Sequence, residues 1–544
     1  MRIPRKRSLA VAALGAAAAL LATAGVSSAA PGLGITDVPT PNTKVAGFPR
    51  PDKLSPELAR HIVAQGSMAL ENPSGANTYY GYDGTDPLIP LPGTTLEAQK
   101  TEPDKNTYLV LPFQKGADPA YDYGSHFLFQ GHETGAPGYI TRVNLDADVD
   151  HRVTLLANSD VIGAPLPVFD GSTWDPFAKR LLFTAELGNS GGVWQATTAV
   201  PAQVQDMSGA LGRGGYEGIQ NDSLGNLYIV EDVGGATLPD KSKAPNSFLY
   251  RFVPVNRADL AAGGKLQVLS LQNAGGTAAF DASVNSADVA ALHTYGTSFK
   301  ASWVTIHDTA VDGSTPYDSN ALAKAKGGTP FKRPENGVFR PGTNFREFYF
   351  TETGDTNATS GANAQFGGWG GVLVYKQANA SATGGTVSLV YKGDQDHTGL
   401  DNIAFLNADH IGVVEDAGDG LHSQRNALDS AYDIQVSHDY SDGALPVRFL
   451  AEGRDASATI DSGLSSLSPL PADFHNEGDN EITGIHVSDG DPTVFGILGV
   501  KIPTAFETLG RWRTFYTQQH GDNVTYQVTR RPFTFRPQDE VNDN

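Results

Sequence analysis

A short pattern recurs along this 544-residue chain: a run of apolar and aromatic residues closes on an acidic residue and is followed by a loop. The six copies end at Glu133, Glu186, Glu231 with Asp232, Asp308, Glu352, and Glu415 with Asp416. Their separation of roughly 45 to 75 residues is typical of propeller blades that carry insertions. A β-sandwich of this size would be unusual, and a β-helix needs a much shorter period. The pattern predicts an all-β fold, a six-bladed β-propeller-like single domain with loop and short-helix insertions.

The rest of the chain has the same texture. From about residue 77 to about residue 528, short apolar segments alternate with turns rich in glycine and aspartate. We therefore assign residues 45–530 to one propeller domain, with tails at residues 31–44 and 531–544. Weak helical patterns at residues 55–65 and 286–292 are expected to form short helices that decorate the sheets.

The first thirty residues have the features of an export signal. A basic region at residues 2–7 is followed by an apolar region at residues 9–23 and by the small residues Ser28, Ala29 and Ala30. The apolar region is too short and too rich in alanine for a membrane anchor. We predict that residues 1–30 are a signal peptide and that the protein is secreted after their removal.

The formal net charge is −21, and the chain contains no cysteine. An acidic protein repels nucleic acid and anionic membranes, so we expect neither as a partner. We also expect a monomer. It also repels a phosphate substrate unless cations are bound in its site, although solubility alone would also select an acidic surface. Without thiolates, a metal site must use oxygen or imidazole ligands, which favours hard cations such as calcium.

Acidic residues at repeated positions would meet in a propeller, because equivalent strand ends converge at one end of the central channel. Glu217 lies between Gly215 and Gly218, and Asp401 follows Gly399 just before an apolar run. Each such cluster on its own is compatible with ordinary turn chemistry. Several of them in one chain favour a site for several cations.

The segment FKRPENGVF sets Arg333 two residues before Glu335, where the pattern indicates a strand next to a turn. Residues i and i+2 of a strand face the same side, so both side chains are expected in one cavity. A guanidinium binds an oxyanion through a planar fork, while a neighbouring carboxylate can hold a metal ion. The pair suits phosphate chemistry, and the alternative is a surface ion pair in a turn.

Seven segments between about Gly171 and about Asp416 resemble, in their order, the PhoX-type alkaline phosphatases, a family of secreted calcium- and iron-dependent β-propeller enzymes. They are TWDPFAKRLLFTAE, GRGGYEGIQNDSLGNLYIVED, FLYRFVPV, FKRPENGVF, FYFTETGD, GGVLVYK and DNIAFLNADHIGVVED. The resemblance implies a six-bladed propeller that hydrolyses phosphate monoesters with calcium and ferric iron. It implies that Arg333 holds the phosphate and acts with Glu335 in catalysis. It also implies a metal site formed by Glu186, Glu217, Asp232, Glu335, Asp401 and Glu415.

One departure from the family pattern concerns the metal. The family has a cysteine followed by two acids where this chain has Ala185, Glu186 and Leu187. Losing a soft anionic ligand weakens an iron site, so calcium is the expected cofactor rather than iron.

The sequence therefore predicts a secreted metal-dependent phosphatase that hydrolyses small phosphate monoesters through a metal-activated water or oxide. Two alternatives remain open at this point. One is a calcium-dependent lactonase or phytase on the same fold. The other is a secreted propeller that uses calcium only for stability and has no catalytic activity.

Overall fold

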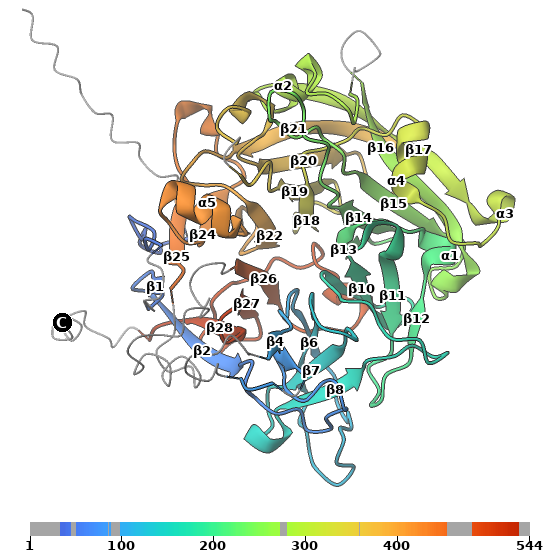
Figure 1. The fold of residues 1–544 in the computed structure, drawn as a ribbon, viewed down its shortest axis with the longest axis vertical. Helices are drawn as coiled ribbons and strands as arrows, with labels where there is room; N and C mark the ends of the chain where they lie inside the picture. The colour runs from blue at the N-terminus through green and yellow to red at the C-terminus, as the bar shows by residue number, and fades with distance from the viewer. Residues whose placement is uncertain are drawn as a thin grey trace, which may run out of the picture.

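The computed structural model describes residues 33–44, 51–84, 86–88, 98–272, 280–357, 360–453 and 481–532. Its sheets are arranged radially around a common centre (Figure 1). The described part of the chain is nearly all β, with short helices between the strands, so the all-β, propeller-like prediction is confirmed. The predicted signal peptide lies outside the described residues.

Three sheets are built from strands that follow one another in the chain and pair antiparallel. One contains β5 (Thr107–Val110), β6 (His126–Gly131), β7 (Ile140–Asn144) and β8 (Val153–Ala157). The next contains β9 (Ser172–Asp175), β10 (Arg180–Ala185), β11 (Gly192–Ala196) and β12 (Val204–Asp206). Another contains β22 (Leu400–Phe405), β23 (His410–Glu415), β24 (Ser430–Gln435), β25 (Val447–Ala451) and the short β1 (Lys53–Leu54).

The largest sheet has nine strands. In spatial order they are β13 (Tyr216–Asn221), β14 (Leu227–Glu231), β15 (Leu249–Pro254), β16 (Gly264–Gln272), β17 (Ser298–Asp308), β21 (Gly384–Lys392), β20 (Gly371–Gln377), β19 (Glu347–Glu352) and β18 (Pro334–Phe339). The long strand β17 pairs with both β16 and β21 and so connects two meanders. Its carboxyl-terminal Asp308 caps a helix and lies 3.4 Å from Lys265 Nζ. Asp308 therefore does not belong to the repeated series of strand ends, because the apolar pattern of β17 serves an outer strand.

The last sheet joins the two ends of the described chain. It contains β26 (Glu481–Ser488), β27 (Arg513–Gln519), β28 (Val524–Arg530) and β2 (Leu58–Ala64). The prediction of a helix at residues 55–65 is wrong, because residues 58–64 pair in antiparallel register with β28. This long-range pairing overrides a weak local helical preference. Strands β3 (Tyr82–Asp83) and β4 (Gln99–Lys100) form a separate small pair.

The helices are short: α1 (Ser208–Leu211), α2 (Ala287–Leu292), α3 (Thr309–Asp312), α4 (Ser319–Ala325) and α5 (Gly418–Arg425). The predicted helix at residues 286–292 is confirmed as α2, whose first turn is capped by the hydroxyl of Ser286. No helix among the described residues is long and apolar enough to cross a membrane. Residues 33–44, expected to form a tail, run along β25, where the Val38 N–H donates to the Arg448 carbonyl.

The apolar core is divided among the spaces between neighbouring sheets. Phe129 from β6, Phe183 from β10 and Trp194 from β11 share one such cluster, and Tyr349 from β19 and Val413 from β23 share another. The innermost strands contact one another in a closed ring, in the order β5, β9, β13, β18, β22, β26 and back to β5. These six strands therefore surround the central channel and position whatever side chains point into it.

Candidate functional site

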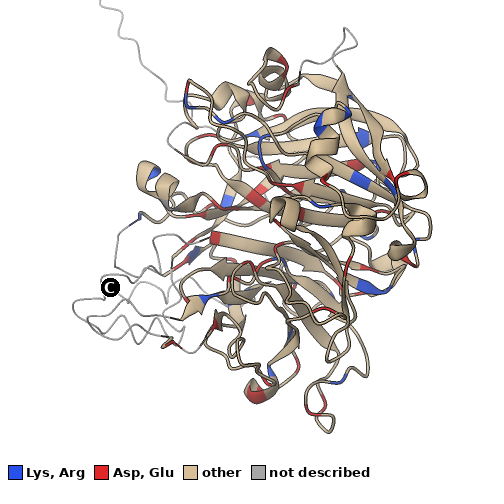
Figure 2. Ribbon diagram, turned by 45° about the vertical axis from the view of Figure 1, so that its right-hand side comes forward, with Lys and Arg blue, Asp and Glu red and all other residues tan. Residues whose placement is uncertain are grey.

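Each strand of the inner ring has an acidic residue within three residues of its first residue. These residues are Asp104, Asp170, Glu217, Glu335, Asp401 and Glu481. The strands next to the ring in four places, β6, β10, β14 and β23, are each followed within two residues by an acid, namely Glu133, Glu186, Asp232 and Asp416. Adjacent strands are antiparallel, so the start of one and the end of the next lie at the same edge. Figure 2 shows acidic residues on the central strands as well as on the outer loops.

Two groups of three carboxylates each lie close enough to hold a metal ion, with ligand atoms within 4.8 Å of one another. The first, called here the Glu335 group, contains Glu217, Glu335 and Asp401. The second, called the Asp104 group, contains Asp104, Glu133 and Asp170. All three members of the Glu335 group were predicted from the sequence as metal ligands.

The Glu335 group contains buried carboxylate oxygens that lack hydrogen-bond donors in the described part of the chain. Glu217 Oε2 and Asp401 Oδ1 are buried and receive no hydrogen bond from any residue that the structure describes. Burial and neighbouring carboxylates raise the pKa of Glu217 and of Glu335 well above the usual range, and raise the pKa of Asp401 to about 7. Buried oxygens without partners beside clustered carboxylates are what a hard cation requires, so the residues present fit a calcium ion.

Neighbouring polar side chains fix these carboxylates in place. Asn336 Nδ2 donates to Glu217 Oε1 at 3.0 Å, and the Thr353 hydroxyl donates to Glu335 Oε1 at 2.5 Å. Asn402 Nδ2 donates to Asp401 Oδ2 at 2.8 Å. One oxygen of each carboxylate is thereby oriented before any ligand arrives, which is the usual role of groups surrounding a metal site.

Arg333 lies beside the Glu335 group. Its Nη2 is 3.6 Å from Glu335 Oε1, so the two side chains lie next to each other. The residue precedes β18 in a left-handed conformation with φ of 54°, which is uncommon for a residue with a side chain and is often found at functional sites. Burial alone would lower the pKa of Arg333, but Asp232, Glu335 and Glu186 together raise it well above the usual range.

The Arg333 guanidinium is held from two sides. Asp232 accepts from Nε at 2.9 Å and from Nη2 at 2.6 Å, and Thr356 Oγ1 accepts from Nη1 at 2.9 Å. About 22% of the side chain remains exposed. A guanidinium positioned in this way keeps donors available for an anion that enters the space beside the Glu335 and Asp104 groups, called here the basin.

The other three predicted ligands lie outside the Glu335 group. Glu186 is exposed, and its charge acts on Arg333. Asp232 forms the ion pair with Arg333 described above. Glu415 is not with them: its oxygens accept from Arg425 Nη1 and Nη2, each at 3.1 Å, and its place near the basin is taken by the next residue, Asp416.

Sequence reasoning missed Asp104, Asp170 and Lys105 as site residues and named Glu133 only as a strand end. A signal for the inner-strand acids does exist, since four of them are followed directly by glycine or asparagine: Asp170, Glu217, Glu335 and Asp401. The pairing has a steric reason at Gly171, where an added Cβ would lie 2.0 Å from the Glu217 carbonyl oxygen.

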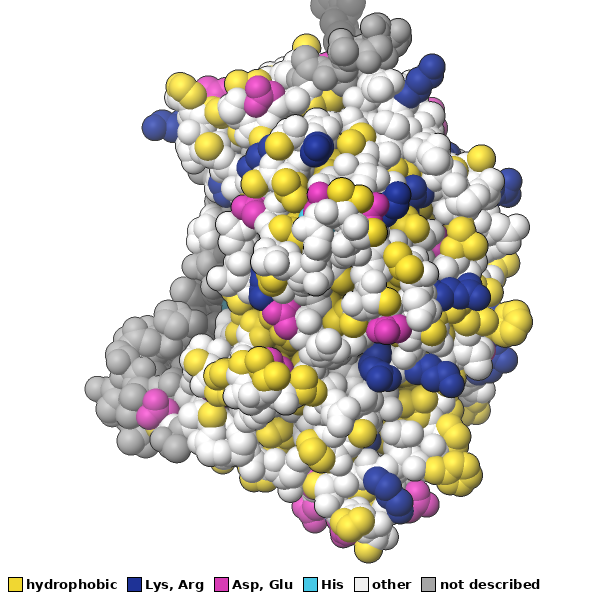
Figure 3. Space-filling view, turned by 90° about the vertical axis from the view of Figure 1, so that its right-hand side faces the viewer, with side chains coloured by type: hydrophobic (Ala, Val, Ile, Leu, Met, Phe, Trp, Pro, Cys, Tyr) yellow, Lys and Arg dark blue, Asp and Glu magenta, His cyan; other side chains and the backbone are white. Residues whose placement is uncertain are grey.

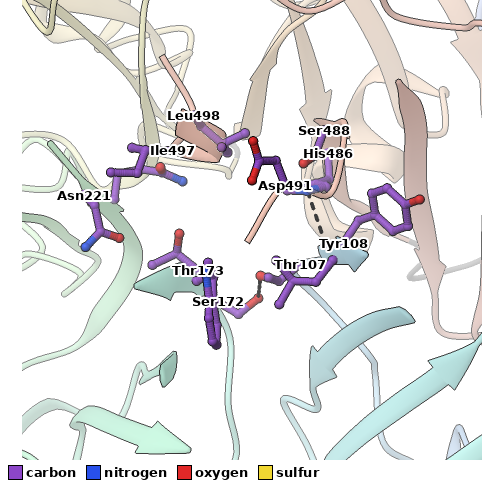
Figure 4. Close-up of a pocket in the computed structure, with 14 residues that line it drawn as sticks. Thr107, Tyr108, Ser172, Thr173, Asn221, His486, Ser488, Asp491, Ile497 and Leu498 are labelled. Carbon is purple, nitrogen blue, oxygen red and sulfur yellow. Dashed lines mark hydrogen bonds between the residues drawn. The ribbon is translucent and has the colours of Figure 1, made fainter. Parts of the chain in front are cut away.

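A small cavity of about 30 Å³ lies among the inner strands, lined by Ser172, Thr173, Asn221 and His486 among others (Figure 4). Residues of the β26–β27 connection, including Ile497, also line it. A space of this size holds one or two water molecules.

The outer surface carries no comparable feature on the face that Figure 3 shows, where basic, acidic and apolar side chains are interspersed. The fold and the basin together define a β-propeller-like protein with a buried, metal-compatible carboxylate site and an adjoining guanidinium.

The family model of alkaline phosphatase PhoX matches residues 199–436. The predicted resemblance to this family is thus confirmed over the matched segment, which contains Arg333 and the whole Glu335 group. No curated protein gave a significant match to the sequence.

Among solved structures, the chain is similar to Pseudomonas fluorescens PhoX in complex with vanadate, described as a transition state analogue. The two are 11% identical, the match covers 91% of this chain and 98% of that chain, and the TM-score is 0.51. A putative phosphatase from Bacteroides thetaiotaomicron is 9% identical over 87% of this chain and 79% of that chain, with TM-score 0.36. TolB from Acinetobacter baumannii is 9% identical over 78% of this chain and 64% of that chain, with TM-score 0.29. At such identities the Pseudomonas structure supports the fold alone, and the other two are too distant to carry an argument.

Proposed function

We propose that this protein is a secreted, metal-dependent phosphatase that hydrolyses small phosphate monoesters. The observation that carries the proposal is the position of Arg333, whose guanidinium lies against the buried Glu335 group in a chain that the PhoX model matches. Substrate capture then combines one fixed guanidinium with the charge of bound cations. This arrangement suits phosphoryl transfer, where catalysis is mainly positioning and charge stabilisation.

Calcium is the proposed cofactor, held by Glu217, Glu335 and Asp401, because these donors are hard carboxylate oxygens and the chain has no thiolate. Ala185, which occupies the position of the family's cysteine, is fully buried and offers no ligand atom. When bound, the metal would supply the positive charge that polarises the phosphoryl group and activates water.

The protein's own residues bind and orient the substrate. Arg333 would donate hydrogen bonds to two phosphoryl oxygens through the two N–H groups that Asp232 and Thr356 leave available. Thr353, Asn336 and Asn402 keep the carboxylates in place, so that little reorganisation is needed as charge builds up on the phosphoryl oxygens.

Six blades are part of the proposal. The nine-stranded sheet would then count as two blades, β13 to β16 and β18 to β21, joined at their outer edges by β17. The closed ring of six inner strands supports this count.

The test is hydrolysis of an aryl phosphate monoester at alkaline pH by the purified protein, measured before and after chelation and again after calcium is restored. We expect activity that chelation removes and calcium restores. Folded protein without activity under all three conditions would overturn the proposal.

Three other outcomes would each indicate a different function. Lactone hydrolysis without phosphatase activity would indicate a lactonase, and strong preference for inositol phosphates would indicate a phytase. A calcium-dependent rise in melting temperature without turnover of any of these substrates would indicate a structural role for the metal.

A further inference from the structure

A lysine lies in the wall of the acidic basin. Lys105 directly follows Asp104 and is 4% exposed. Its Nζ donates to Asn402 Oδ1 at 2.6 Å and to the Ile485 carbonyl at 3.4 Å. Both partners are neutral carbonyl oxygens, so this buried ammonium is satisfied by hydrogen bonds while its charge acts on the surrounding carboxylates.

Carboxylates of both groups act on that charge. Burial lowers the pKa of Lys105, and four carboxylates oppose the change, Asp104 and Asp170 from one group and Asp401 and Glu217 from the other. The positive charge of Lys105 also affects a neighbouring histidine: burial, together with this charge, lowers the pKa of His486 to about 3. The ammonium is thus an electrostatic neighbour of both groups.

Hydrogen bonds connect the ammonium to one acid of each group. Asn402, which accepts from Lys105, donates to Asp401 Oδ2 and, at 3.0 Å, to Thr483 Oγ1. The Thr483 hydroxyl in turn donates to Asp104 Oδ1. The chain from Lys105 through Asn402 and Thr483 therefore fixes the separation between the two groups.

The equivalent positions on the other inner strands make this lysine distinctive. The residues that directly follow the six inner-strand acids are Lys105, Gly171, Gly218, Asn336, Asn402 and Ile482. Two asparagines donate hydrogen bonds to carboxylates of the Glu335 group, and two glycines leave room for neighbouring backbone. Lys105 alone of the six brings a positive charge.

We propose that Lys105 is a built-in cation that takes the place of a metal ion between the two carboxylate groups, so that the basin binds fewer or weaker divalent cations than its carboxylates alone would. The inference deepens the proposed metal-dependent function and rests on it. It assigns Lys105 a positioning role and no contact with the substrate.

The test replaces the ammonium by an apolar group of similar length, Lys105→Met, and uses calcium ion alone as the probe. After chelation, calcium binding is measured by titration calorimetry, and the melting temperature is recorded with and without calcium. We expect K105M to bind calcium about tenfold more tightly or to bind one additional ion, since a unit charge has been removed from beside the site. We expect its melting temperature to fall in chelator and to recover in calcium.

Lys332→Met is the matched control. Lys332 is also buried, with 1% of its side chain exposed, but its Nζ lies 3.2 Å from Asp355 Oδ1, outside both carboxylate groups. K332M should lose stability equally with and without calcium and should keep the calcium affinity of the unaltered protein.

Every outcome bears on the inference. K105M that folds only when calcium is present supports it, because the metal then replaces the missing charge. K105M that behaves like K332M, or that fails to fold regardless of calcium, would overturn it in favour of a structural lysine. If the unaltered protein binds no calcium, the proposed metal site itself fails, and that result is separate from any difference between the variants.

Discussion

Two sets of buried acids in neighbouring parts of the sheets differ in the hydrogen-bond donors and cations that contact their carboxylates. The Glu335 group at the start of the inner strands has buried oxygens without hydrogen-bond donors. The strand-end glutamates, Glu231, Glu352 and Glu415, close the second strands β14, β19 and β23 and are fully buried. Glu352 lies 2.7 Å from His293 Nε2, and Glu415 is paired with Arg425.

The comparison teaches which acids serve structure and which serve a ligand. Glu415 receives hydrogen bonds from Arg425, from the Thr398 and Ser430 N–H groups and from the Tyr432 hydroxyl, so it has no capacity left for a metal ion. The Glu335 group keeps that capacity. A carboxylate adjacent to a strand end is therefore assigned by its hydrogen-bond partners and not by its place in a sequence pattern.

Removing the cation that pairs with a strand-end glutamate should have the largest effect on stability. Arg425→Met leaves Glu415 buried without its cation, which we expect to cost about 3 to 5 kcal/mol of unfolding free energy. Denaturant unfolding measures it, and Arg511→Met, which removes a largely exposed partner of Asp489, should cost less than about 1 kcal/mol. A loss no larger for R425M than for R511M would contradict the structural assignment of Glu415.

Changing the Glu335 group should affect activity instead. Glu335→Gln removes a proposed metal ligand, and we expect kcat/KM for an aryl phosphate to fall at least about 100-fold. The melting temperature in chelator should hold or rise, because one of three crowded carboxylates becomes neutral. Glu347→Gln, whose side chain pairs with Arg340 away from the basin, is the control and should keep full activity.

Arg333 offers a further test of the comparison, because its guanidinium lies next to Glu335. Arg333→Ala should raise KM and lower kcat, with a combined loss of about 100-fold in kcat/KM. Steady-state kinetics of folded protein measure this loss. Unchanged kinetics would remove Arg333 from the phosphate site.

The last prediction concerns the pH dependence of stability and Glu231, the strand-end glutamate that is paired with no cation among the described residues. Burial raises its pKa to about 8, against hydrogen bonds from Asn320 and Tyr250 that lower it. A raised pKa means that the native state binds the proton more tightly than the unfolded state. The stabilisation is thus complete below the usual glutamate pKa and is lost as the pH rises through about 8.

Glu231→Gln should flatten this dependence by about 1 kcal/mol for each pH unit between those values. Urea unfolding of both proteins at several pH values, in the same calcium concentration, measures the difference. Parallel stability curves would show that Glu231 does not titrate in this range.

Much of the architecture could be predicted from the spacing of apolar strands, and the proximity of Arg333 and Glu335 from their two-residue spacing. The metal-ligand roles of Glu217, Glu335 and Asp401 followed only from the resemblance to a known family. Asp308 was assigned wrongly because an outer strand such as β17 has the same apolar pattern as a second strand. Residues 58–64 were assigned wrongly because their partner lies near the other end of the chain. Lys105 could not be recognised, since its role depends on Asn402 and Thr483, which are remote in sequence.

The pairing of β2 with β28 also sets an order of events during synthesis. Strand β2 is made long before its partner at residues 524–530. The circle of sheets therefore cannot be sealed until β28 has been made, and β2 lacks this partner while the sheets between them are synthesised. Contacts of such long sequence separation fold slowly, and an unsealed ring presents open sheet edges to other chains in the meantime.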